Sequence, residues 1–156
     1  MLIFNQSINH ALDAALTDTQ KRLRVLMYSI STPSARSHLL FIRTWKALEN
    51  CIKRGVETKI ILSDWPPSNP QQAASIKAAL LLRLWGASVK AANHGVIFHP
   101  KAWCFDDELL IIGSHNATEA GLTRTQNISY LGHNLAEIGQ FNDFFDSAWG
   151  RLGEHV

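Results

Sequence analysis

Cysteine is scarce in this sequence, with only Cys51 and Cys104 among 156 residues. Two cysteines this far apart exclude a disulfide framework and a cysteine-rich metal site, so we expect both to be reduced packing residues. No apolar run approaches the roughly 18 residues that a membrane-spanning helix needs. The first residues, MLIFNQSINHALDAALTDTQKR, have neither a basic start nor a long apolar block and do not resemble a secretory signal. We therefore expect a cytoplasmic protein without stable membrane association.

Charge of neither sign dominates, and no low-complexity tract or linker divides the chain. The formal net charge is +2, which permits an anionic partner but does not by itself indicate nucleic acid. The length suits one domain with a single substantial core. We expect residues 1–156 to form one domain.

Hydrophobic periodicity predicts helices and strands that alternate in the first half of the chain, followed by consecutive strands and a last helix. Such an order indicates an α/β fold with a mixed sheet sandwiched between helices. A short turn or helix is expected at 119–122. The remaining predicted helices are 7–20, 38–55, 71–85 and 135–149, and the predicted strands are 22–31, 56–64, 87–93, 96–106, 108–116 and 127–131.

The pattern that carries chemistry lies in two of these predicted strands, 96–106 and 108–116, which are joined by a tight turn. Alternate side chains of a strand share a face, so His99 and Lys101 are expected to point the same way. Ser114 and Asn116 share a face at the end of the neighbouring strand. An imidazole, an ammonium, a hydroxyl and an amide then converge on one patch, which suits a phosphate.

Each of these groups has a chemical task at a phosphate. A neutral imidazole can attack phosphorus and form a covalent intermediate, which divides one difficult displacement into two easier ones. An imidazole also titrates near neutral pH, so a second copy can protonate the leaving oxygen. Lys101 offers a positive charge to the non-bridging oxygens, and Ser114 and Asn116 offer hydrogen bonds. Gly113 lets the backbone approach closely at the end of the strand.

The spacing H-x-K-x4-D-x6-G-S-x-N over 99–116 resembles the signature of the phospholipase D superfamily. All six signature positions match, including Asp106 and Gly113, and the preceding β-α-β organisation is similar over most of the chain. This resemblance implies an α/β/α sandwich, a phosphohistidine intermediate, and neither metal nor other cofactor. Alternation turns Asp106 away from His99, which favours a structural role in the turn.

The chain has one copy of the motif, because none of its other histidines is followed by lysine two positions later. A complete site then needs two chains, with both His99 residues meeting across a two-fold axis. Small single-motif members of this superfamily are characteristically homodimeric nucleases. The resemblance therefore implies an endonuclease, with DNA as the expected substrate and RNA as the alternative. A lipid phosphodiesterase or phosphatidyl transferase, and an inactive module that binds nucleic acid or protein, remain as rival functions.

One position departs from the superfamily. An Asn-x-Glu run usually follows the motif, and its glutamate orients the histidine, whereas this sequence has Asn127 and Ser129. Asp107, Glu108 and Glu119 are the candidate substitutes. Among the neighbouring residues, Trp103 and Phe105 are expected in the core or at a dimer contact, with base stacking as the alternative, and His115 is expected to be structural. Arg124 is a further candidate for the cleft.

Overall fold

The computed structural model describes residues 1–66, 68–92 and 98–153. In this part of the chain the strands form one seven-stranded mixed sheet in the order β1-β7-β6-β5-β2-β3-β4. Strands β2, β3 and β4 are parallel, while β5, β6, β7 and β1 add antiparallel pairs. The strands are β1 Leu2–Phe4, β2 Arg22–Met27, β3 Glu57–Leu62, β4 Ser88–Ala91, β5 Lys101–Phe105, β6 Leu109–Gly113 and β7 Ile128–Gly132.

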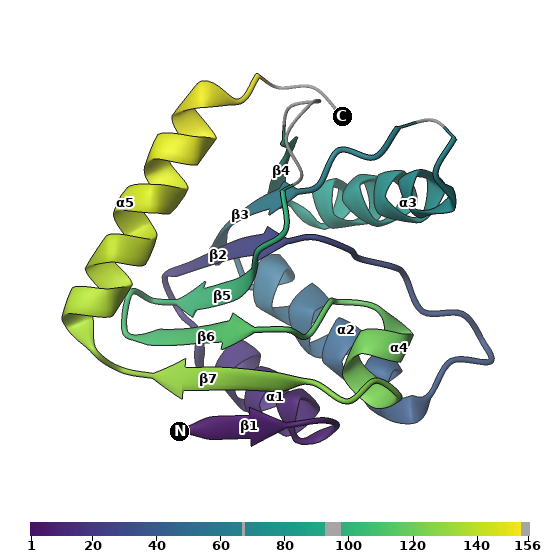
Figure 1. Cartoon of the computed structure of the whole chain (residues 1–156), viewed down its shortest axis with the longest axis horizontal. Helices are drawn as coiled ribbons and strands as arrows, with labels where there is room; N and C mark the ends of the chain where they lie inside the picture. Colours follow the sequence, from purple (N-terminus) through teal and green to yellow (C-terminus); the bar gives the residue numbers. More distant parts are fainter. Residues whose placement is uncertain (67, 93–97, 154–156) are drawn as a thin grey trace.

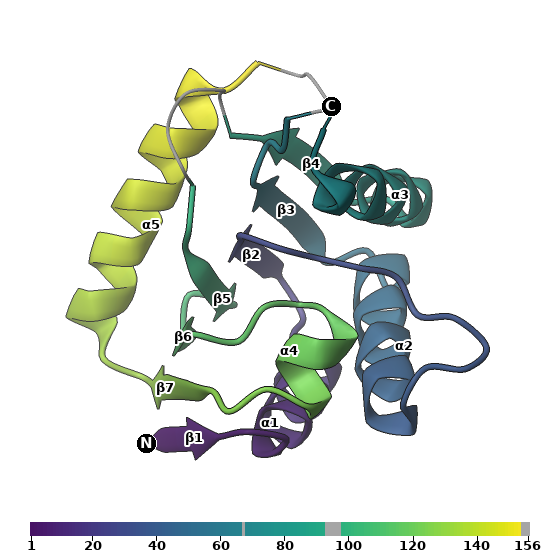
Figure 2. The same cartoon turned by 45° about the vertical axis from the view of Figure 1, so that its right-hand side comes forward.

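Helices cover both faces of this sheet, as Figure 2 shows with α5 on one side and the remaining long helices on the other. They are α1 Ser7–Asp18, α2 Leu39–Lys53, α3 Pro70–Trp85, the short α4 Glu119–Thr123, and α5 Leu135–Arg151. Two buried clusters separate these layers: one joins α1, α2 and α3 to the sheet, and the other packs α5 on the opposite face. Burying a large apolar side chain contributes roughly 1.5–3 kcal/mol, so the two clusters hold the three layers together. The predicted α/β/α sandwich is confirmed (Figure 1).

Local sequence signals set the helix ends. Asn69 caps α3 by accepting a hydrogen bond from Gln71 N, Pro70 follows at the first helical position, and Gly86 ends the helix with φ of 116°. Only glycine adopts such a conformation without strain. Asn134 likewise caps α5 by accepting from the backbone N–H groups of Ala136 and Glu137. These caps explain why periodicity located the long helices within a few residues of their observed ends.

The strands near the motif differ from the predicted ranges. Strand β5 begins at Lys101, so His99 precedes the strand instead of lying in it, and residues 96 and 97 of the predicted range lie outside the described residues. Strand β2 ends at Met27, beyond which Ile30 makes only an isolated bridge to Ala117. Strand β1 was not predicted, because three residues at a sheet edge carry no periodic signal and are ordered by pairing with β7.

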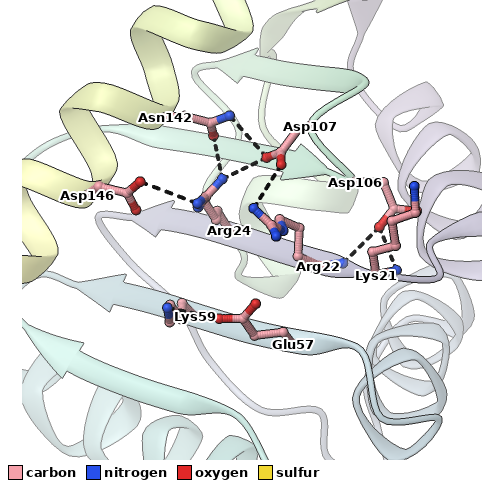
Figure 3. A network of polar contacts seen from close by, with 9 residues as sticks. All are labelled: Lys21, Arg22, Arg24, Glu57, Lys59, Asp106, Asp107, Asn142 and Asp146. Atoms are coloured by element: carbon pink, nitrogen blue, oxygen red, sulfur yellow. Dashed lines mark hydrogen bonds and ion pairs between the residues drawn. The ribbon is translucent and has the colours of Figure 1, made fainter.

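The turn between β5 and β6 is held by a network of charged groups (Figure 3). Asp106 and Asp107 have φ of 52° and 59°, a conformation that aspartate tolerates better than most residues. The Asp106 carboxylate accepts hydrogen bonds of 2.8 Å from the backbone N–H groups of Gln20, Lys21 and Arg22. The expected structural position of Asp106 in the turn is thus what the structure has, and the turn fixes the hairpin to the start of β2.

Both cysteines are buried and free. Burial raises the pKa of each thiol to about 11, because desolvation disfavours the thiolate. They are packing residues, as expected. No helix in the described ranges is long and apolar enough to span a membrane.

Candidate functional site

The motif residues lie at one end of three adjacent strands, where β2 ends at Met27, β5 begins at Lys101 and β6 ends at Gly113. Lys101 pairs with Met27 of β2, and Ala102 pairs with Ile112, which brings the open end of the β5–β6 hairpin beside the end of β2. Gly113 pairs in turn with Ser129 of β7. The charged turn of Figure 3 lies at the other end of the same hairpin.

His99 and Lys101 are in direct contact. Lys101 Nζ lies 3.1 Å from both Nδ1 and Nε2 of the His99 ring and donates a hydrogen bond of 2.9 Å to the His99 carbonyl oxygen. A neutral imidazole has one acceptor nitrogen, so only one of the two ring contacts can be a directed hydrogen bond. The sequence prediction that the imidazole and the ammonium point to the same place agrees with this contact.

Tyr28, which the sequence did not single out, completes the surroundings of this pair. Its ring centroid lies 4.2 Å from that of His99, and Lys101 Nζ lies 4.7 Å from the centroid of the Tyr28 ring. The imidazole, the Tyr28 ring and the Lys101 ammonium are therefore in mutual contact, while the His99 residue stays exposed. No local pattern marks Tyr28, because its role depends on β2 ending opposite β5.

Lys101 is unusual in being a buried lysine, with 6% of its surface exposed. Burial lowers the pKa of its ammonium, because desolvation disfavours the charged form. No carboxylate forms an ion pair with Lys101 in the described part of the chain. A buried cation without a fixed counter-ion is suited to an anionic ligand.

Ser114 and Asn116 lie just beyond the end of β6. Ser114 Oγ donates a hydrogen bond of 2.9 Å to Asn127 Oδ1, and its residue is exposed. Asn116 is half-buried, and its Oδ1 is a buried acceptor without a hydrogen-bond partner among the described residues. No hydrogen bond in the described ranges joins either residue directly to His99 or Lys101.

A cavity lies beside the second half of the motif. Its volume is about 680 Å³, and Asn116, Asn127 and Tyr28 are part of its lining. Tyr28 and Asn127, which both line the cavity, contact His99 and Ser114 respectively. The four predicted residues thus lie near the same strand ends.

Gly113 is required by its neighbour in β7. A Cβ at this position would overlap Ser129 Oγ and the Ile128 carbonyl oxygen. Ser129 Oγ in turn lies 2.7 Å from His115 Nδ1, and His115 Nε2 lies 3.1 Å from the Asn5 carbonyl oxygen. Since a carbonyl only accepts, Nε2 carries the proton, and the Ser129 hydroxyl donates to Nδ1. His115 is buried and has both nitrogens paired, in accord with its expected structural role.

The structure distinguishes the three residues that were candidates to replace the family glutamate. Asp107 binds Arg22 and Arg24 in the charged turn, and Glu108 lies in the same turn, so both are at the wrong end of the hairpin. Glu119 is at the correct end and lines the cavity, where it pairs with Arg124 at 3.4 Å. Arg124 therefore lines the cleft as suggested, whereas Trp103 and Phe105 are buried core residues.

No group of three or more His, Cys, Asp or Glu side chains in residues 1–66, 68–92 and 98–153 is arranged to bind a metal ion. The polar groups that this site offers are instead an imidazole, a buried ammonium, a hydroxyl and amides. Groups of these types are suited to an anionic ligand.

Known structures share this fold across nearly the whole chain. Nuc of Salmonella typhimurium, a phospholipase D family member, superposes with a TM-score of 0.80 at 20% identity, covering 98% of this chain and 96% of Nuc. NucT of Helicobacter pylori gives a TM-score of 0.75 at 13% identity, with coverage of 97% and 96%. Phosphatidylserine synthase of Haemophilus influenzae gives 0.71 at 13% identity, covering 99% of this chain and 39% of that enzyme. At these identities the likeness establishes the fold.

No curated protein sequence matches the chain. The family model described as "Cardiolipin synthase, PLD-like domain" matches residues 12–149, which include the entire motif. Since that match spans far more than half of the sequence, this chain belongs to the phospholipase D-like family.

Proposed function

We propose that this protein is a phosphodiesterase of the nuclease type that acts as a homodimer, without a metal, through a covalent phosphohistidine. The observation that carries the proposal is the contact between an exposed imidazole and a buried ammonium, His99 and Lys101, at 3.1 Å. A phosphodiester bound beside His99 would present its non-bridging oxygens to the Lys101 cation. Ser114 and Asn116 are the proposed hydrogen-bond donors to those oxygens.

The proposed reaction has two displacements. In the first, a ring nitrogen of His99 attacks phosphorus, the bond to the leaving oxygen breaks, and that oxygen takes a proton from His99 of the partner subunit. In the second, water attacks the phosphohistidine, the partner histidine accepts the water proton, and the N–P bond breaks. The two steps regenerate both histidines, and one residue acts as acid and then as base.

An exposed apolar surface supports the second subunit. Leu2, Phe4, Ile112, Ile128 and Tyr130 are between 38% and 56% exposed. They are neighbours on one face of β1, β7 and β6, because Leu2 and Ile112 both pair with Tyr130, and Phe4 pairs with Ile128. Contiguous exposed apolar patches indicate interaction surfaces.

This apolar surface lies on the sheet face opposite to the Lys101 side chain, because Ile112 pairs with Ala102, and it reaches the motif at Ser114. Ser114 Oγ accepts a hydrogen bond of 3.0 Å from Ile128 N, and Ser114 N donates one of 3.0 Å to the Ile128 carbonyl oxygen. A partner subunit seated on Ile128 therefore meets the motif at Ser114. Because the chain has a single motif, a second copy is the occupant that also supplies the missing histidine.

A mixing experiment tests the shared site. Wild-type and His99→Ala proteins are dissociated, combined in equal amounts and reassembled, and hydrolysis of a single-stranded oligonucleotide is measured in excess EDTA. If each site needs two His99 residues, random pairing leaves about one quarter of the activity of the same total amount of wild type, against about one half for independent subunits. Mass spectrometry after an alkaline quench should find the phosphoryl adduct on His99. Activity that requires a divalent ion would contradict the mechanism.

A lipid substrate is the second candidate, because the matching family model is described by a cardiolipin synthase and one structural relative is a phosphatidylserine synthase. Flotation with anionic liposomes and a headgroup-release assay distinguish this candidate. Release of headgroup in preference to cleavage of an oligonucleotide would favour it. An inactive binding module is the third candidate, in line with the archaeal chromatin protein TrmBL2, whose structure shows a novel mode of DNA binding (TM-score 0.62). The His99 adduct would exclude it.

A further inference from the structure

The cavity beside the motif has the size of a binding site for a small molecular group. Its volume of about 680 Å³ lies within the range of about 300–1,000 Å³ that is usual for small-molecule sites. The walls come from the segment after β2, from the start of α3 with the loop before it, and from the segment that contains α4. Figure 2 shows α3 and α4 flanking the chain that leaves β2.

Asn116, from the second half of the motif, lines the cavity, and Tyr28 in the same lining contacts His99 of the first half. The Tyr28 ring lies between His99 and Trp65, with centroid distances of 4.2 Å and 4.6 Å. On the opposite side, Asn127 lines the cavity and accepts the Ser114 hydrogen bond. A group bound in the cavity would therefore lie beside the residues that contact His99 and Ser114.

The lining favours an uncharged occupant. Among the residues that the structure describes, Glu119 and Arg124 are the charged ones in the lining, and they pair with each other at 3.4 Å. Their charges offset one another, and Lys101, whose ammonium contacts the Tyr28 ring, is not part of the lining. A second phosphate would find no net positive charge in this lining to attract it. A neutral group would bind here without the desolvation cost of a charged one.

The remaining polar groups match the edge of a nucleobase. Trp65 Nε1 is a buried donor and Asn116 Oδ1 a buried acceptor, and neither has a partner among the described residues. Ser29 Oγ donates a hydrogen bond of 2.9 Å to Gln71 Oε1, which fixes a side-chain amide in the same lining. Base carbonyl and amino groups complement a side-chain amide such as that of Gln71, and the Trp65 and Tyr28 residues in the lining offer aromatic rings for stacking.

We propose that this cavity binds the nucleobase of the nucleotide whose phosphate is attacked by His99. This inference rests on the proposed phosphodiesterase function and specifies its substrate as a nucleic acid in which that base is unstacked. Trp65 stacks on the base or donates to it, and Gln71 contributes its amide. Neither residue takes part in the displacement at phosphorus.

Matched chromogenic esters separate the cavity from the chemistry. Thymidine 5′-(p-nitrophenyl phosphate), its 3′ isomer and methyl p-nitrophenyl phosphate release the same p-nitrophenolate, and only the first two carry a base. The ratio of kcat/KM between a nucleoside ester and the methyl ester measures the contribution of the nucleoside. Trp65→Leu and Gln71→Ala should lower this ratio by about 5- to 100-fold for one of the two isomers. Gln72→Ala is the matched control, because Gln72 follows Gln71 in α3 and is outside the cavity lining.

The methyl ester reports the integrity of the site, since displacement of Trp65 can disturb Tyr28 and His99. A ratio that is unchanged in both variants would overturn the inference while leaving the proposed function intact. Wild type that hydrolyses none of the esters and cleaves no oligonucleotide would overturn the proposed function. In that case equilibrium dialysis measures base binding directly. Thymidine 5′-phosphate should bind more tightly than ribose 5-phosphate, and Trp65→Leu should abolish the difference in affinity. Equal binding of the two by wild type would overturn the inference.

Discussion

The two ends of the β5–β6 hairpin carry polar residues of the same motif, yet they differ in how those residues are paired. At the turn, Asp106 accepts three backbone hydrogen bonds, and Asp107 binds Arg22, Arg24 and Asn142. At the open end, Lys101 has no carboxylate partner in the described ranges, and Asn116 Oδ1 has no hydrogen bond. The turn has polar groups that satisfy one another, whereas the open end has a buried cation without a carboxylate partner and a buried amide oxygen without a donor among the described residues.

This difference separates structural from chemical residues within one short sequence pattern. Buried polar groups are almost always paired in folded proteins, so an unpaired one needs a reason such as ligand binding. A paired group such as Asp106 stabilises the fold and has little capacity left for a substrate. The following substitutions test this division, beginning with the largest expected effect.

His99→Ala should reduce kcat by at least about 10³-fold, because it removes the proposed nucleophile. His99 is exposed, so the thermal unfolding temperature should stay close to that of wild type. Steady-state hydrolysis and a thermal melt are the measurements. His133→Ala is the control, since His133 is an exposed histidine near the turn, bonded to the Glu108 carbonyl oxygen. Comparable losses in both variants would contradict the division.

Lys101→Met should reduce kcat by about 10²- to 10³-fold, because it removes the cation proposed to stabilise charge on the phosphate. Methionine has a similar volume, and the loss of a buried charge should leave stability unchanged or improved. Urea unfolding with parallel kinetics provides both quantities. Lys77→Met on the exposed face of α3 is the control. A strongly destabilised but active Lys101→Met protein would show that Lys101 belongs with the structural residues.

Asp106→Asn should lower the unfolding free energy by about 1–3 kcal/mol at neutral pH and leave kcat within about two-fold of wild type. Burial acts to raise the pKa of Asp106, but the N–H groups of Gln20, Arg22 and Lys21 outweigh it and hold the pKa below its ordinary value. The carboxylate therefore stabilises the fold above the unfolded pKa of about 3.9 and loses this effect as pH falls through the folded pKa. The difference between variant and wild type, measured by urea unfolding, should shrink below about pH 4.

An Asp106→Asn protein that is as stable as wild type but inactive would show that Asp106 is needed for the reaction and not for the fold. Asparagine tolerates the same positive φ, so the substitution removes the charge without straining the turn.

His115→Phe should give the smallest effect, a loss of about 1 kcal/mol at pH 8 with activity retained. His115 lies between Ser114 and Asn116 but has both nitrogens paired, so we group it with the structural residues. Burial lowers its pKa, although the hydrogen bond to Asn5 opposes the shift. Below about pH 6.5 the unfolded chain therefore takes up a proton at His115 more readily than the folded protein does. As the pH decreases, the contribution of His115 to the free energy of unfolding decreases too. The difference between variant and wild type should be smaller at pH 5 than at pH 8.

The sequence alone predicted the motif residues because their spacing is local. His99 and Lys101 are two positions apart, and Asp106 and Asp107 mark the turn that returns the chain beside β5. The helix ends were likewise visible, as at Asn69 and Gly86. Tyr28 and Trp65 were missed, because they reach the site only through the pairing of β2 with β5 and the packing of a loop. Ser129 was noted as a departure, but its bond to His115 was visible only in the structure.

The sequence by itself determined the α/β class, the family resemblance and the two residues proposed for the chemistry at phosphorus, since periodicity and short spacings depend on neighbouring residues. Only the tertiary structure decided that Lys101 is buried against Tyr28 and that Asn116 lines a cavity with Trp65. It also decided that the face around Ile128 and Tyr130 is uncovered. The physical reason is that burial, unpaired hydrogen-bonding groups and cavities arise where segments distant in sequence meet.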